Sequence, residues 1–111
     1  MSEDKQEILN GIPASSGHAT GIVRIVTGQE DEDDFQENEI LVTEITDPTM
    51  VMMMNRASGI ICDIGGITSH PSILSRELGI ACVVGTKEAT KKLKTGDNVT
   101  INGTTGKVFL A

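Results

Sequence analysis

Two short apolar runs, residues 60–64 and 80–84, enclose a segment with helical features, and this arrangement points to a mixed α/β fold. Both runs are mostly apolar and bounded by glycines, as buried strands are. Pro71 suits the first turn of the helix between them, and Gly79 suits its end. The sequence therefore predicts a strand, a glycine turn, a helix and a second strand in succession.

The rest of the chain adds further elements around this unit. Asp47 is expected to cap a helix that begins at Pro48, and Gly59 to end it in a left-handed conformation. Four methionines in this helix are expected to pack in the core rather than form a functional surface. Asn102-Gly103 is a turn dipeptide between the last two strands. The helices are expected at residues 48–57 and 87–93, and the strands at 21–26, 39–43, 98–101 and 106–110. The prediction is an α/β domain in which helices cover a sheet.

Length and charge limit the class of protein. A chain of 111 residues corresponds to one domain. Its net charge of −7, with no Trp or Tyr, argues against a nucleic-acid binder. Much of the charge lies in an acidic run at residues 30–39, which we expect to be a solvated loop, with a docking patch or a hard-cation site as alternatives. The acidic residues of this run are Glu30, Asp31, Glu32, Asp33, Asp34, Glu37 and Glu39.

The N-terminal residues and the cysteines are the next features. We expect residues 1–7 to be a flexible leader and residues 8–17 an irregular, tightly turned segment. The sequence has no signal-peptide pattern and no apolar run of the roughly 18 residues a membrane span needs, so a soluble cytoplasmic protein is expected. Cys62 and Cys82 are expected to be reduced and buried. A Cys/His metal site with His70 is the alternative, although no CxxC-type pair supports it.

His70 stands at the start of the expected helix, directly after the turn at residues 65–69. Backbone N–H groups and the positive end of the helix dipole suit a transient anion there, such as a phosphoryl group. They also disfavour imidazolium, which leaves the ring neutral and nucleophilic. The hydroxyls of Thr68 and Ser69 are candidates to orient a ring nitrogen. From the residues alone, a plain capping or surface histidine remains the alternative.

This segment resembles the active-site motif of the phosphoenolpyruvate-utilising enzymes, above all in the synthase and dikinase branch. The family pattern is Gly-Gly-x-Thr-x-His followed by small residues, aliphatic residues and Arg. The matching residues are Gly65, Gly66, Thr68, His70, Ser72, Ile73, Leu74, Ser75 and Arg76. Two departures are Pro71, where the family usually has Ala, Ser or Thr, and Ala81, which replaces a common proline.

The resemblance covers residues 8–111 and implies the swivelling phosphohistidine domain, an α/β fold of three layers, β/β/α. It implies that His70 is the phosphoacceptor and that Thr68 hydrogen-bonds the imidazole or the phosphoryl group. Arg76 is implied as a phosphate or docking contact, and His18 is expected to be structural or at the surface. The implied phosphoryl-binding residues are Gly65, Gly66, Ser69 and Ser72.

The chain has no room for the family's other domains, one of which is a barrel of about 250 residues. The resemblance therefore implies partner domains or subunits that bind ATP and pyruvate or phosphoenolpyruvate. It implies Mg²⁺ in their sites and no cofactor on this domain, and neither nucleic acid nor a membrane is an expected partner. Three interpretations stay open. The chain is a free-standing carrier whose His70 relays phosphoryl groups, an excised part of a larger synthase or dikinase, or a non-enzymatic module that binds partners according to the state of His70.

Overall fold

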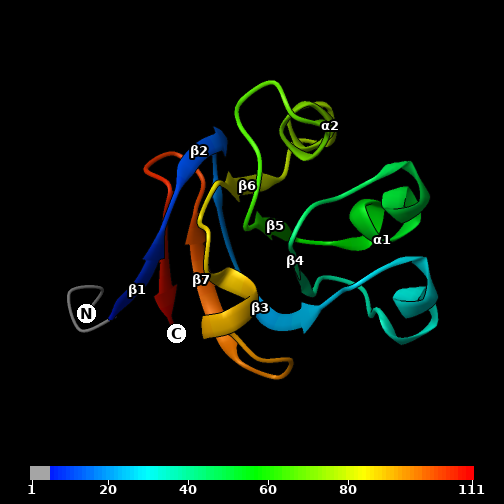
Figure 1. The fold of residues 1–111 in the computed structure, drawn as a ribbon. Coiled ribbons are helices and arrows are strands. Elements are labelled where there is room, and N and C mark those ends of the chain that lie inside the picture. Colours follow the sequence, from blue (N-terminus) through cyan, green and yellow to red (C-terminus); the bar gives the residue numbers. More distant parts are fainter. Residues whose placement is uncertain (1–5) are drawn as a thin grey trace.

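The computed structural model describes residues 6–111, which fold into strands flanked by short helices (Figure 1). The strands are β1 (Glu7–Asn10), β2 (Ile12–Ser15), β3 (His18–Ile25), β4 (Ile40–Thr43), β5 (Gly59–Cys62), β6 (Ala81–Val84), β7 (Asn98–Asn102) and β8 (Lys107–Leu110). The α-helices are α1 (Val51–Arg56), α2 (His70–Leu78) and α3 (Ala89–Lys92), and the 3₁₀ helices are η2 (Gln29–Asp34) and η3 (Pro48–Met50). These elements include each of the strands and helices that the sequence predicts between residues 21 and 110.

The long strand β3 joins an antiparallel half and a parallel half of one strand array. Its first residues pair antiparallel with β7, which is followed outward by β8 and β1. Its last residues pair parallel with β4, which is followed by β5, β6 and the antiparallel edge strand β2. Strand β3 therefore passes from one layer of the domain to the next.

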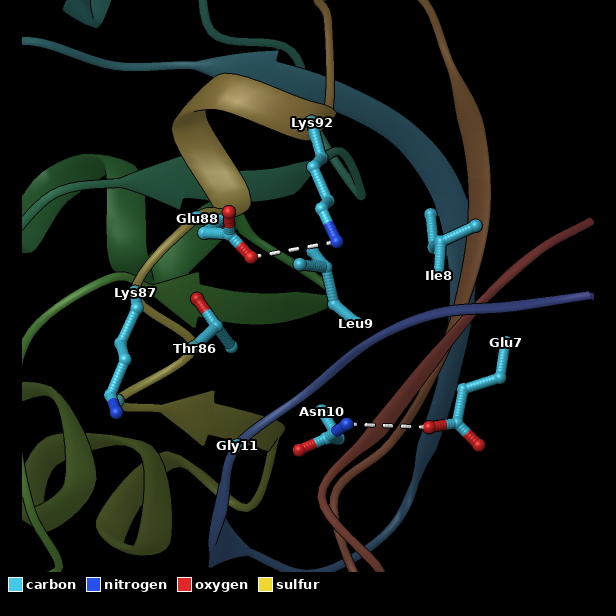
Figure 2. Close-up of a pocket in the computed structure, with 10 residues that line it drawn as sticks. Glu7, Ile8, Leu9, Asn10, Gly11, Thr86, Lys87, Glu88 and Lys92 are labelled. Carbon is cyan, nitrogen blue, oxygen red and sulfur yellow. Dashed lines mark hydrogen bonds and ion pairs between the residues drawn. The ribbon is translucent and has the colours of Figure 1, made fainter.

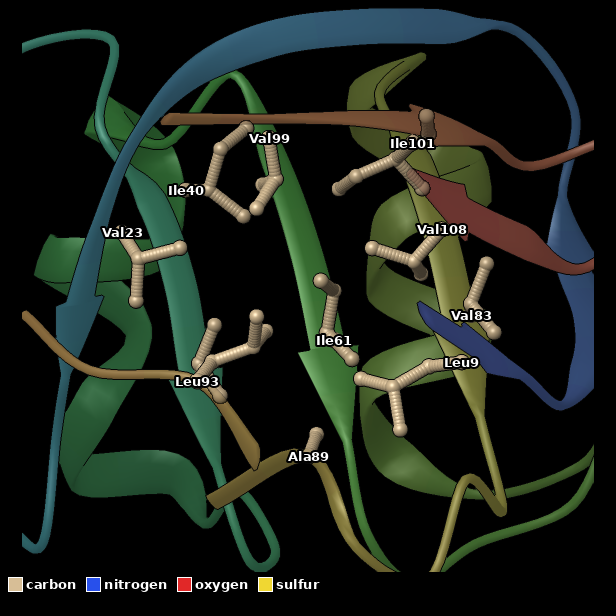
Figure 3. Close-up of a cluster of buried hydrophobic side chains, with 12 residues drawn as sticks. Leu9, Val23, Ile40, Ile61, Val83, Ala89, Leu93, Val99, Ile101 and Val108 are labelled. Atoms are coloured by element: carbon tan, nitrogen blue, oxygen red, sulfur yellow. The ribbon is translucent and has the colours of Figure 1, made fainter. Parts of the chain in front are cut away.

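The parallel strands β4, β5 and β6 are buried on both faces. On one face, Ile40, Val42 and Ile61 pack in a cluster that includes Val99 and Val108 from the antiparallel half (Figure 3). On the other, alternate residues such as Leu41 and Ile60 pack against the α1 and α2 side of the domain, with Met53, Met54 and the partly buried Leu74. Figure 1 shows these two helices on one side of the parallel strands and β7 on the other. The expected three-layer β/β/α fold is confirmed.

The segment at residues 8–17 is not irregular, as expected from the sequence, but contains two strands. Strand β1 pairs with β8, and strand β2 pairs with β6, so the segment reaches both edges of the array. Glu7 belongs to β1, and the Gln6 carbonyl accepts a hydrogen bond from the Leu110 N–H, so these two residues are part of the fold rather than of a leader. Residues 1–5 of the expected leader lie outside the described residues.

The helical segment after β4 differs from expectation at its end. Asp47 caps it as predicted, with a carboxylate oxygen that accepts the Thr49 N–H at 2.8 Å. The helix ends at Ala57 in an extended conformation, and Gly59 is the first residue of β5, so the predicted left-handed cap is wrong. Three of the four methionines are buried as expected, whereas Met52 is 59% exposed because it lies on the outer face of α1.

The first part of the acidic run forms the 3₁₀ helix η2, and most of its acidic side chains are solvated as expected, but its last residue, Glu39, is not. Glu39 is 8% exposed and makes a bidentate ion pair with Arg24, at 3.0 and 3.1 Å. Burial opposes ionisation of Glu39, but the Arg24 guanidinium and the Gln36 N–H still hold its pKa below the ordinary value. Residues 6–111 contain no group of three or more His, Cys, Asp or Glu side chains arranged to hold a metal ion.

Gly106, in the turn between β7 and β8, and Gly79, after α2, both have a left-handed conformation. Gly106 has φ +79°, and a Cβ at this position would lie 2.3 Å from the Gly11 carbonyl oxygen. Gly79 has a similar φ of +74° and no atom within 4 Å of a Cβ. We expect Gly79→Ala to lower the free energy of unfolding by about 1–2 kcal/mol through the left-handed conformation alone. Gly106→Ala should cost at least about 1 kcal/mol more, because the β1–β2 connection must also move. Urea unfolding of both variants tests this, and equal losses would contradict it.

Candidate functional site: His70 at the amino end of α2

His70 is the first residue of α2 and lies at the carboxyl-end edge of the parallel strands. The turn that leads to it follows β5, and the loop after β4 runs beside this turn. Backbone hydrogen bonds join the two, from the Asp63 N–H to the Thr43 carbonyl at 3.1 Å and from the Ile64 N–H to the Glu44 carbonyl at 3.0 Å. In open α/β sheets this edge is where ligand and active sites form.

The imidazole of His70 is held by Thr46, in the loop after β4. The Thr46 hydroxyl lies 2.8 Å from His70 Nδ1. Thr46 is only 5% exposed, whereas His70 is half-buried, so Nδ1 faces the protein. Nε2 lies on the opposite side of the five-membered ring and is the nitrogen left to meet a reactant. The hydrogen bond therefore occupies Nδ1 and leaves Nε2 as the candidate nucleophile.

Sequence reasoning gave no role to Thr46, because it stands 24 residues before His70. The one hint was that Thr46-Asp47-Pro48 belongs to the part of the chain that resembles the family. The expected ring partner, Thr68, is instead exposed in the turn before α2. Its contact with a phosphoryl group stays a prediction, whereas the hydrogen bond to the unmodified ring belongs to Thr46.

The hydroxyls of Ser69 and Ser72 hold the turn before His70. Both donate to the Gly66 carbonyl at 2.7 Å, and the Ser69 N–H donates to the same oxygen at 3.0 Å. The expectation that Ser69 orients the ring is therefore wrong in this structure. Ser72 is completely buried, so its predicted phosphoryl contact would require this bond to break. These bonds fix the shape of the turn that precedes His70.

Gly65 and Arg76 complete the turn. Gly65 has φ +136°, and a Cβ there would lie 2.9 Å from the Ser69 hydroxyl, so only glycine fits beside the Gly66–Ser69 bonds. A Cβ on Gly66 would meet no atom within 4 Å, which leaves its surface open. The exposed Arg76 side chain turns back along α2 and donates to the Ser72 carbonyl at 3.1 Å and to the Ile67 carbonyl. Arg76 thus braces the turn, and its contact with phosphate or a partner stays a prediction.

The His70 ring lies between the positive end of a helix dipole and a negatively charged carboxylate. The amino end of α2 presents the positive end of its helix dipole. Asp47 follows Thr46 directly, and its ionised carboxylate is near enough to interact with His70. Bonds from the Thr49 hydroxyl and N–H hold the pKa of Asp47 below its ordinary value, and His70 adds to this shift. The site therefore has a negative side, toward Asp47, and a positive side, at the helix end.

Both cysteines are free and buried, as expected. Burial raises the pKa of Cys62 well above its usual range and that of Cys82 to about 11. The Cys82 thiol lies under the start of α2, 3.9 Å from the Pro71 carbonyl oxygen. In the described part of the chain, His70 and the cysteines form no metal-binding group, so the alternative of a Cys/His metal site finds no support.

A separate hollow lies away from His70. It has a volume of about 360 Å³ and is lined by β1 and by the segment from Gly85 to Lys92, with an ion pair between Lys92 and Glu88 at 3.5 Å (Figure 2). None of the site residues predicted from the sequence lines it. His18 is exposed at the start of β3, in agreement with its expected surface position.

The fold and site define a β/β/α domain that presents one partly exposed histidine at the amino end of a helix. The family model of the PEP-utilising enzyme mobile domain matches residues 35–106, and the chain belongs to this family. Within residues 6–111, no helix is long and apolar enough to cross a membrane.

Curated relatives agree with this family. Over 107 residues, which are 96% of this chain, it is 54% identical to a probable phosphoenolpyruvate synthase of Pyrococcus horikoshii and 53% identical to the phosphoenolpyruvate synthase of Pyrococcus furiosus. The chain spans only 13% of the length of each of these relatives.

Two solved structures are similar to the chain in fold. A solution structure of Enzyme I is 32% identical, with a TM-score of 0.61 over 69% of this chain and 32% of the other. The holo-form of aconitase X from Thermococcus kodakaraensis has a TM-score of 0.67 over 93% of this chain and 97% of the other. Its identity is 20%, so it shows likeness of fold alone.

Burial of the thiols predicts chemical inertness. Since their pKa values are raised, the thiolate fraction at pH 8 is smaller than in an exposed cysteine, and access is blocked. We expect Ellman's reagent to leave both thiols of the native protein unmodified during a time in which the urea-unfolded chain reacts completely. Rapid reaction of the native protein would contradict the burial described above.

Proposed function

We propose that this chain is a phosphoryl carrier in which His70 is phosphorylated at Nε2 and relays the group between two sites on other domains or subunits. One of these sites binds ATP, and the other binds pyruvate or phosphoenolpyruvate. The observation that carries the proposal is the bond between Thr46 and His70 Nδ1 at the amino end of α2. Family membership and the phosphoenolpyruvate synthase relatives support the choice of substrates.

The proposed transfer uses one nitrogen as nucleophile and the other as anchor. When Nδ1–H donates a hydrogen bond to the Thr46 hydroxyl oxygen, Nε2 is the unprotonated nitrogen and keeps its lone pair. The Nε2 lone pair attacks a phosphorus atom of the donor, and the bond from phosphorus to the leaving oxygen breaks with its electron pair on that oxygen. In the second step an oxygen of the acceptor, such as pyruvate enolate, attacks the same phosphorus, and the electron pair of the P–N bond returns to Nε2.

The site suits a transient phosphoryl group. The positive end of the α2 dipole stabilises the added negative charge. Nδ1–H can keep donating its hydrogen bond to Thr46 throughout, so the ring need not change its tautomer or its anchor. Pro71 lacks an N–H, so the first turn of α2 has one donor fewer for the phosphoryl group than the usual family residue would supply.

The donor and acceptor sites belong, in this proposal, to parts that correspond to the remaining length of the phosphoenolpyruvate synthase relatives. Mg²⁺ is proposed in those partner sites, where it would offset phosphate charge. This chain is proposed to contribute the histidine, its anchor and the helix end.

The phosphoacceptor can be tested by substitution. We expect incubation with ATP or phosphoenolpyruvate and an extract of the source cells to add one acid-labile phosphate to the chain, measured by intact mass. His70→Ala should abolish this label, because no other group has the same anchored nitrogen at a helix end. His18→Ala is the matched control, since His18 is an exposed histidine on β3, and it should label normally. A label retained by His70→Ala would overturn the assignment.

The anchor can be tested separately. Thr46→Val removes the hydroxyl but keeps the shape, and a neutral hydrogen bond contributes about 0.5–1.5 kcal/mol. We expect the labelling rate at saturating donor to fall by roughly 3- to 10-fold, with little change in the donor concentration for half-maximal rate. Thr46→Ser, which keeps a hydroxyl, should restore most of the rate. Equal rates in wild type and Thr46→Val would show that Thr46 does not position the ring.

A further inference from the structure

Four exposed isoleucines lie on the two loops and the helix turn next to His70. Ile45, Ile64, Ile67 and Ile73 are between 49% and 55% exposed. Of the nine large hydrophobic residues exposed in residues 6–111, these four belong to the loops and the helix turn that frame the histidine. Such a concentration marks an interaction surface, whereas single scattered residues would not.

Backbone hydrogen bonds and helix geometry hold these residues beside the site. Ile45 immediately precedes Thr46, the anchor of the ring. Ile64 follows β5, and its N–H donates to the Glu44 carbonyl, so it lies beside the Ile45 loop. Ile67 belongs to the turn braced by Arg76. Ile73 stands three residues after His70 on α2, which places it on the same helix face. We call these four residues the isoleucine collar.

A groove with acidic residues adjoins the collar. It has a volume of about 340 Å³, and Ile45 and Asp47 are among its lining residues. Glu44 and Asp47 supply its charge, and both are exposed, while no Lys or Arg lines it. An apolar collar next to an acidic groove is complementary to an apolar surface that carries a basic side chain.

We propose that the isoleucine collar is the docking surface for the protein domain that donates the phosphoryl group to His70, and that this domain inserts a basic side chain into the groove between Ile45 and Asp47. The identity of the partner rests on the proposed function. Phosphoryl transfer needs a site from which water is excluded, and a ring of isoleucines closed against a partner excludes water around Nε2. The chain spans 13% of its synthase relatives, so a donor domain of that kind would lie in the other 87%.

Binding to a synthase tests the proposal. The binding partner is the phosphoenolpyruvate synthase of Pyrococcus furiosus with its own motif histidine replaced by alanine. This chain is labelled with ¹³C at its isoleucine δ1 methyl groups, and unlabelled synthase is added. We expect the collar methyl signals to shift or broaden. The signal of Ile22 should not change, since this residue is 42% exposed but pairs with Asn98 in the antiparallel half, at the amino-end side of the parallel strands.

Matched variants separate docking from folding. Ile67→Ser with Ile73→Ser should weaken binding and slow His70 labelling by the synthase with ATP by at least about tenfold, as hot-spot contacts do. Ile22→Ser should change neither quantity. Because all three residues are exposed, each variant should keep the wild-type melting temperature within a few degrees. Glu44→Lys should also weaken binding if a basic side chain enters the groove, while unchanged binding would remove the groove from the proposal.

The outcomes distinguish this inference from the proposed function. Normal labelling of His70 with unaffected collar variants would overturn the collar and leave the carrier function standing. Collar binding without any labelling of His70 would support the docking surface and contradict the carrier function. Collar signals that shift with protein concentration in the absence of synthase would assign the surface to a second copy of this chain and overturn the proposal.

Discussion

Burial of the parallel strands β4, β5 and β6 on both faces is the constraint on which the rest of the domain depends. Each of these strands has an uninterrupted buried run, so neither face can be left to water. The antiparallel half covers one face, and α1 and α2 cover the other. Strand β3 belongs to both layers, and β1 and β2 close the two edges. The parallel strands therefore form the middle layer, between the antiparallel strands and the helices.

The same constraint creates the site. Parallel strands end at a common edge, so the loop after β4 and the turn after β5 lie side by side although they are far apart in the sequence. The first contributes Thr46, and the second leads into His70. Two short loops thereby position a histidine whose Nδ1 is held by a hydrogen bond. A carrier domain needs little more, because the donor and acceptor chemistry is proposed to lie elsewhere.

The central strand–turn–helix–strand unit is predicted well from the sequence because each of its signals depends only on neighbouring residues. Apolar runs, bounding glycines and Pro71 each specify a neighbouring conformation. The N-terminal strands could not be predicted in the same way, since β1 and β2 have four residues each and depend on partners near residues 108 and 83. Thr46 was missed for the same reason, because its contact with His70 spans 24 residues. The sequence could not show that the Ser69 hydroxyl donates to the Gly66 carbonyl rather than to the His70 ring, because a hydroxyl near a turn has a backbone carbonyl as a competing partner.

The most direct test of the central claim is to find which ring nitrogen of His70 carries the phosphoryl group. The ¹⁵N-labelled chain, phosphorylated by the synthase or by extract, would be examined by long-range ¹H–¹⁵N and ³¹P NMR. We expect phosphorus coupled to Nε2 and a protonated Nδ1 that still donates its hydrogen bond to Thr46. Phosphorus on Nδ1, or on another residue, would contradict it.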